Sequence, residues 1–195
     1  MVRKFIFTLF LVMSAPAVFG ALKTGDLLLQ PLSCWSCFLI EEQENTKFSH
    51  MGIYFNIDGE DLVLEAYGEV KLTPLADFLN RTEVGENVQV RRFKNINFLE
   101  KELIRIALPM VGLSYDNEFL WFNENQKGEK LYCSELAYKL FYKFYGEGLP
   151  LKPMSYDKNR KYWAKFFKDN IPDGKLGNSP GDFERSKLFE TVGHL

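Results

Sequence analysis

SHMGIYFNIDGEDLVLEAY, residues 49–67, predicts a β-hairpin and decides the fold. Over the first half of this stretch every second residue is apolar, and this alternation is typical of a half-buried strand. Asp58-Gly59 is a typical two-residue hairpin turn, and residues 61–67 continue as the return strand. The alternating apolar positions are Met51, Ile53, Phe55 and Ile57.

The hairpin brings two ionisable side chains to one face. If residues 57 and 60 pair across the turn, His50 falls opposite Tyr67, and Glu65 lies diagonally across from His50. A carboxylate at that distance can orient the imidazole and stabilise its charged form. Taken singly, each residue also has a plainer explanation: a hydrogen bond to backbone for His50, and a solvated strand face for Glu65.

A second stretch, KLYCSELAYKLF at residues 130–141, places a cysteine at the start of a helix. Apolar residues recur at helical spacing from Cys133 onward, while Glu135, Lys139 and Lys143 fall on another face. The thiol is expected in the first turn, where unpaired amides and the helix dipole favour an anion. A thiolate there would be nucleophilic, with donors beside it for an oxyanion.

The numbers of cysteines and histidines limit which residues can be the nucleophile and its base. Cys34 and Cys37 form the motif CWSC and can close on each other, which leaves Cys133 over. A lone cysteine is often only a small buried hydrophobe. A nucleophile needs a base, however, and His194 lies next to the C-terminus, where chains are commonly mobile. The sequence therefore pairs Cys133 with His50.

Five segments, taken in order, carry a resemblance to a known family. They are GDLLLQ (25–30), FSHMGIYF (48–55), LEAYGEVKLTPLADFL (64–79), GLSYD (112–116) and LYCSELAY (131–138). The chain resembles the permuted papain-like amidases, the YiiX/YebB-like branch of the NlpC-related cysteine peptidases. The likeness covers almost the whole chain beyond residue 20. It is specific in combining SH-x-G with YCSEL, and the histidine precedes the cysteine, as the permuted branch requires.

The resemblance implies both a fold and a set of roles. The fold is α+β, circularly permuted papain-like, with a small antiparallel sheet or barrel packed with helices. Cys133 would be the nucleophile, His50 the base and Glu65 the group that orients the histidine, while Tyr115 would help the Cys133 amide hold the oxyanion. The implied reaction cleaves an amide or an ester through an acyl-enzyme at Cys133, with no cofactor.

The N-terminal residues predict export. Arg3 and Lys4 precede the apolar run 5–13, and small residues follow it. This pattern is typical of a secretory signal peptide, here over residues 1–20, and the run is too short to span a bilayer. Residues 21–195 are then expected to form a single domain in a periplasmic or secreted protein.

Charge and amphipathicity limit the partners. The 24 basic and 26 acidic residues nearly balance, so composition gives no sign of a nucleic-acid partner. The expected substrate is a cell-wall peptide, an N-acyl amino acid or a lipid of the cell envelope. KNRKYWAKFFK (158–168) gathers aromatic residues on one side of a helix. Packing on the core is favoured for this helix, and contact with a membrane surface is the alternative.

The same patterns predict the remaining elements. Strands are expected at 26–30, 50–57, 61–67 and 87–93, and helices near 34–44, 97–110 and 133–145. Pro109 should end or kink the helix near 97–110. Near the C-terminus, Ser179 is expected to cap a short helix, with Pro180 at its first position and Asp182 completing the capping arrangement.

Two other functions stay open at this point. CWSC follows an apolar strand and could open a helix, which is the setting of a thiol-disulfide redox pair. However, no βαβ succession follows it, and zinc would need ligands that no second cluster supplies. A non-catalytic exported binding module would keep a pocket but would need no reactive thiol beside a histidine.

Overall fold

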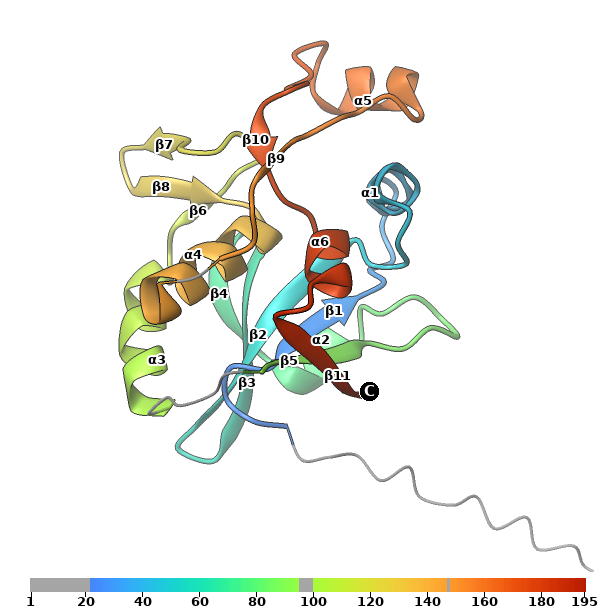
Figure 1. The fold of residues 1–195 in the computed structure, drawn as a ribbon. Helices are drawn as coiled ribbons and strands as arrows, with labels where there is room; N and C mark the ends of the chain where they lie inside the picture. The colour runs from blue at the N-terminus through green and yellow to red at the C-terminus, as the bar shows by residue number, and fades with distance from the viewer. Residues whose placement is uncertain (1–21, 95–99, 147) are drawn as a thin grey trace, which may run out of the picture.

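The computed structural model describes residues 22–94, 100–146 and 148–195 (Figure 1). The predicted signal peptide and the first residues of the helix predicted at 97–110 lie outside this part. Within the described ranges, no helix has both the length and the apolar character that crossing a membrane would require.

The centre of the fold is a nine-stranded sheet in the order β11-β5-β1-β2-β3-β4-β6-β8-β7, and β9 and β10 form a separate two-stranded ribbon. All neighbouring strands run antiparallel except β6 and β8. The strands are β1 (Leu27–Gln30), β2 (His50–Ile57), β3 (Glu60–Tyr67), β4 (Glu69–Pro74), β5 (Gln89–Phe93), β6 (Ser114–Tyr115), β7 (Glu124–Asn125), β8 (Gly128–Leu131), β9 (Lys152–Pro153), β10 (Leu176–Gly177) and β11 (Phe189–His194).

Helices cover both faces of the sheet. Residues of α3, α4 and α6 share the largest apolar cluster with one face, and Phe78 of α2 packs against the other face. The helices are α1 (Cys37–Glu44), α2 (Leu75–Leu79), α3 (Glu100–Ala107), the 3₁₀ turn η1 (Leu108–Met110), α4 (Cys133–Tyr145), α5 (Arg160–Phe166) and α6 (Pro180–Arg185). The architecture is the predicted α+β class.

The predicted hairpin register is confirmed. Ile57 pairs with Glu60, and Gly52 pairs with Glu65. The apolar positions from Met51 to Phe55 face the α4 side, as the alternation predicted. The prediction of a half-buried strand is wrong, since β2 is buried on both faces over its first six residues. The polar face is buried because α2 packs over it with Phe78.

Several element boundaries follow from local chemistry. Helix α3 stops at Ala107, and Pro109 falls in η1, as predicted. Helix α1 starts at Cys37, three residues later than predicted, because residues 34–36 form the turn closed by the disulfide. The predicted capping box of α6 is present, with Ser179 and Asp182 bonded reciprocally.

A smaller aromatic cluster joins α1 and α5 beyond the ends of the sheet strands (Figure 1). Trp163 and Phe167 are buried there against Leu39 of α1, so the packing predicted for this amphipathic helix is confirmed. Contact with a membrane surface remains an untested prediction. Exposed Trp35 lies against Phe166 at the outer edge of this cluster.

Candidate active site

Cys133 occupies the first position of α4, as the sequence predicted. The chain enters the helix through Tyr132 in an extended conformation (φ −91°, ψ 167°), and its side chain makes no capping hydrogen bond. Helix geometry leaves the first amides without intrahelical partners, so they remain available as donors beside the thiol. The thiol is free and buried, and it lies where the helix dipole favours an anion.

His50 is the first residue of β2, a central strand of the sheet, and its side chain is buried. Its Nε2 lies 2.7 Å from Glu65 Oε2. The Cys133 side chain is the other polar neighbour that acts on the imidazole, and Nδ1 is the ring nitrogen left to face it. Burial alone lowers the pKa of His50, but the hydrogen bonds with Cys133 and Glu65 outweigh it and raise the pKa to about 9.

Aromatic rings fix the plane of the imidazole. The ring centroids of Tyr67 and Phe78 each lie 5.8 Å from that of His50. Tyr67 is the cross-strand neighbour that the register predicted, whereas Phe78 comes from α2. With Nε2 bonded to Glu65, these contacts leave the imidazole little freedom to turn.

Glu65 is fully buried and accepts hydrogen bonds from three side chains. Besides His50, Thr73 Oγ1 and Arg81 Nη2 each donate to Oε1 at 2.6 Å. Burial alone raises the pKa of Glu65, but His50, Thr73 and Arg81 together lower it to about 2. The plain explanation of Glu65 as a solvated strand residue is therefore wrong, and its carboxylate is held in its charged form.

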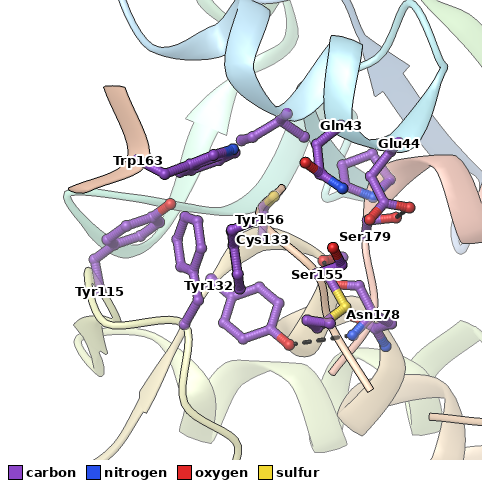
Figure 2. Close-up of a pocket in the computed structure, with 15 residues that line it drawn as sticks. Gln43, Glu44, Tyr115, Tyr132, Cys133, Ser155, Tyr156, Trp163, Asn178 and Ser179 are labelled. Carbon is purple, nitrogen blue, oxygen red and sulfur yellow. Dashed lines mark hydrogen bonds between the residues drawn. The ribbon is translucent and has the colours of Figure 1, made fainter. Parts of the chain in front are cut away.

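Tyr115 ends β6 and lines the same pocket as Cys133. Its hydroxyl points into that pocket from the wall opposite Asn178 (Figure 2). Burial, together with the neighbouring Cys133 and Asp116, raises the pKa of Tyr115 well above its usual range. The hydroxyl therefore stays protonated at neutral pH and can act as a hydrogen-bond donor.

The pocket beside Cys133 measures about 490 Å³ out to its open mouth. Its walls come from α1, from the segments that carry Tyr115 and Tyr156, from α5, and from the turn between β10 and α6 (Figure 2). Eight of the fifteen lining residues are aromatic or apolar: Ile40, Tyr115, Phe119, Tyr132, Met154, Tyr156, Trp163 and Pro180. Such a mixture of apolar walls and few polar groups is typical of small-molecule sites.

Sequence reasoning found four residues of this site and missed Thr73 and Arg81. Thr73 follows the alternating residues Val70 and Leu72 on β4, a strand that we did not predict. Had that alternation been assigned to a strand paired with β3, the register would have put Thr73 diagonally beside Glu65. Arg81 carries no comparable signal, because it reaches Glu65 from the loop after α2.

The other candidate residues lie apart from this cluster. Cys34 and Cys37 form a disulfide across the start of α1. His194 is exposed at the end of β11 and pairs with Gln89 of β5. The expectation of a mobile tail at His194 is therefore wrong, because the last residues add a strand to the sheet.

Comparisons with known proteins find relatives in both sequence and fold. A model of the permuted papain-like amidase enzymes of the YaeF/YiiX, C92 family matches residues 21–192. The uncharacterized protein YiiX of Escherichia coli (strain K12) is 32% identical over 133 residues, which are 67% of this chain and 63% of that protein. The chain thus aligns with less than two thirds of the length of that relative.

A solved structure shares the fold. The crystal structure of YiiX from Escherichia coli O157:H7 superimposes with a TM-score of 0.78 at 23% identity, covering 88% of this chain and 96% of that chain. That YiiX is described as a metalloprotein. Among the residues described here, no group of three or more His, Cys, Asp or Glu side chains could hold a metal ion.

The family model covers the hairpin, the cysteine helix and the residues that close the sheet. Its match extends over far more than half of the chain, and the identity to YiiX and the shared fold agree with it. This chain therefore belongs to the permuted papain-like amidases of the YaeF/YiiX, C92 family.

Proposed function

We propose that this protein is an exported cysteine hydrolase that cleaves an amide or ester bond through an acyl-enzyme at Cys133. The observation that carries the proposal is the position of His50, which bonds to Glu65 at 2.7 Å and has its pKa raised by the neighbouring Cys133 side chain. A nucleophile, a base and a group that orients the base are the parts that covalent acyl transfer needs.

The reaction would proceed in two halves. The Cys133 thiolate attacks the substrate carbonyl, and the charged His50 then gives its proton to the leaving amine or alkoxide as the C–N or C–O bond breaks. The product of this half is a thioester at Cys133. Water, deprotonated by neutral His50, attacks the thioester in the second half, which releases the acid and returns the thiol.

The oxyanion of each tetrahedral intermediate needs donors close to the thiol. The first amides of α4 supply them, because they have no intrahelical partners and lie at the positive end of the helix dipole. We assign the Tyr115 hydroxyl as a further donor, since it is held protonated and points into the same pocket. Donors fixed in advance stabilise the developing charge without reorganisation.

The hydrolase is favoured over the two alternatives by the placement of the cysteines. Cys34 and Cys37 are bonded to each other at the start of α1, whereas the free thiol is the one that meets a histidine. A redox protein would have no use for the buried Glu65–His50 pair. A binding module would have no use for a histidine kept charged beside a thiol.

The predicted location and substrate follow from the sequence and remain proposals. A signal peptide over residues 1–20 would deliver the protein to the periplasm or outside the cell, where a peptide, an N-acyl amino acid or a lipid of the envelope is the substrate. The reaction as derived needs no cofactor. Contact with a membrane surface through the α5 region would suit a lipid substrate.

The test compares hydrolysis of an activated acyl reporter, 4-nitrophenyl butyrate, by three proteins. Wild type should release nitrophenol catalytically, Cys133→Ala should not, and the double variant Cys34→Ser, Cys37→Ser should keep most of the activity. Retention of activity in Cys133→Ala together with its loss in the double variant would refute the hydrolase and support the redox function.

A further inference from the structure

The pocket beside Cys133 presents a neutral, largely apolar surface. Glu44 contributes a carboxylate to the lining, but Lys152 Nζ lies 2.5 Å from it and Arg185 Nη2 lies 3.5 Å from it. These cations neutralise the carboxylate, which therefore does not offer a free charge to a ligand. Recognition in the pocket must rest on apolar contact and on neutral hydrogen-bonding groups.

Asn178 lines the same pocket as Cys133, and the two chain neighbours of that cysteine hold its backbone. Its backbone N–H donates to the Tyr132 hydroxyl at 3.4 Å, the bond drawn in Figure 2. Its backbone carbonyl accepts a hydrogen bond from Ser134 Oγ at 3.1 Å. Tyr132 and Ser134 thus hold the backbone of Asn178 in place, and its side chain starts from a fixed position in the pocket wall.

The carboxamide of Asn178 has no partner. The residue is 2% exposed, and among the described residues neither Oδ1 nor Nδ2 finds a hydrogen bond. Buried side-chain polar atoms are nearly always bonded, so a donor and an acceptor left together unpaired require an explanation. Trp163 Nε1 and the Tyr156 hydroxyl are likewise buried without partners, and both residues line the same pocket.

We propose that Asn178 determines specificity by pairing with a second amide in the acyl part of the substrate. A secondary amide has one donor and one acceptor, which match Oδ1 and Nδ2. The acyl part is the part that stays bonded to Cys133, so it must lie in the pocket that reaches the thiol. The substrate class is then an N-acylated amino acid or peptide, and a plain acyl chain is disfavoured.

This inference rests on the proposed acylation of Cys133, but it can be tested without turnover. Chloromethyl ketones alkylate a thiol directly, so their rates report the fit of the acyl part whether or not the protein is a hydrolase. The two probes are N-acetyl-phenylalanyl chloromethyl ketone and its ester analogue, in which oxygen replaces the amide N–H. They differ in the one donor that would meet Asn178 Oδ1.

Intact-mass kinetics of Cys133 labelling should show the amide probe reacting at least about tenfold faster than the ester probe, because an unpaired acceptor in a buried site rejects the analogue that lacks the donor. In Asn178→Leu the two rates should become equal. Asn170→Leu, the same substitution at an exposed asparagine that does not line the pocket, should preserve the ratio.

A stability measurement separates this role from a structural one. Asn178→Leu replaces an unpaired buried amide by an apolar side chain, so its melting temperature should equal or exceed that of wild type. Equal labelling by both probes in wild type, no labelling by either, or a preference that survives in Asn178→Leu would each overturn the inference. The hydrolysis assay with 4-nitrophenyl butyrate tests the proposed hydrolase activity separately from these labelling experiments.

Discussion

His50 lies between a carboxylate and a thiol, and both favour its charged form. The raised pKa of about 9 means that the imidazolium persists through neutral pH and is lost only as the pH rises through that value. A charged imidazole next to Cys133 favours the thiolate, which is the nucleophilic form of cysteine. The reactivity of Cys133 should therefore depend on His50 up to about pH 9.

Alkylation by iodoacetamide measures this dependence. At pH 7, Cys133 in wild type should react about tenfold faster than in His50→Ala, because an unperturbed thiol is only a few per cent thiolate there. The difference should vanish above about pH 9, where His50 loses its charge. Equal rates in the two proteins at pH 7 would show that Cys133 and His50 do not form an ion pair.

Glu65 acts on the reaction through His50. Glu65→Gln keeps the size of the side chain but removes the charge that stabilises the imidazolium, so kcat should fall. The loss should be roughly 10- to 100-fold smaller than that in Cys133→Ala, because removal of an orienting group leaves the covalent route in place. Glu60→Gln, on the exposed start of the same strand, is the matched control and should keep the wild-type rate.

The pairing of β2 with β3 determines the distance between His50 and Glu65, and the two strands approach each other closely at Gly52. A Cβ atom added at Gly52 would lie 2.4 Å from Val63 Cγ1 and 3.1 Å from the Leu64 carbonyl oxygen. Gly52 is the glycine of the SH-x-G segment, two residues after His50. Its lack of a side chain lets β3 approach closely enough for Glu65 to reach the imidazole.

Gly52→Ala should therefore destabilise the protein by about 1–3 kcal/mol, as overpacking of a core does, and should lower activity. Denaturant unfolding gives the free energy of unfolding. Gly193→Ala is the control, because a Cβ there meets no atom within 4 Å. A Gly52→Ala protein as stable as wild type would show that this close approach does not constrain the hairpin.

Local sequence patterns could not predict which residues are buried outside the apolar stripe of a helix. The spacing of α4 predicted the apolar stripe correctly, but it put Glu135 and Lys139 on another face in a setting typical of solvent. Both are buried: the Glu135 carboxylate lies 2.7 Å from the Lys139 ammonium, which also contacts Glu129 of β8 and the ring of Trp121. The apolar period of a helix does not show whether another segment of the chain covers its remaining faces.

For the whole molecule, the sequence was most informative where one local signal sufficed. The turn at Asp58-Gly59 fixed the register that brings His50 and Glu65 together, and the family resemblance put Cys133 beside them. The short strands β6 to β10 and the C-terminal strand β11 have too few residues or too weak an alternation to be predicted alone. Their pairing depends on partners brought together only by the complete fold.

Export is a prediction about the whole chain. Expressed with its own N-terminus in a secreting host, the protein recovered outside the cytoplasm should begin at Ala21, because cleavage follows the small residues near Gly20. Intact-mass measurement of the exported fraction identifies the first residue of the mature protein directly. Full-length protein retained in the cytoplasm would contradict the proposed location and leave the chemistry of the pocket unaffected.

The proposed mechanism requires that the acyl group is carried on Cys133. It is tested most directly by brief exposure to 4-nitrophenyl butyrate, acid quench and tryptic peptide mass spectrometry with fragmentation. Wild type should carry one butyryl group on the peptide 131–139, with fragment ions assigning it to Cys133, and Cys133→Ala should carry no such adduct. An acyl group on Ser134, or nitrophenol release that continues unchanged in Cys133→Ala, would contradict it.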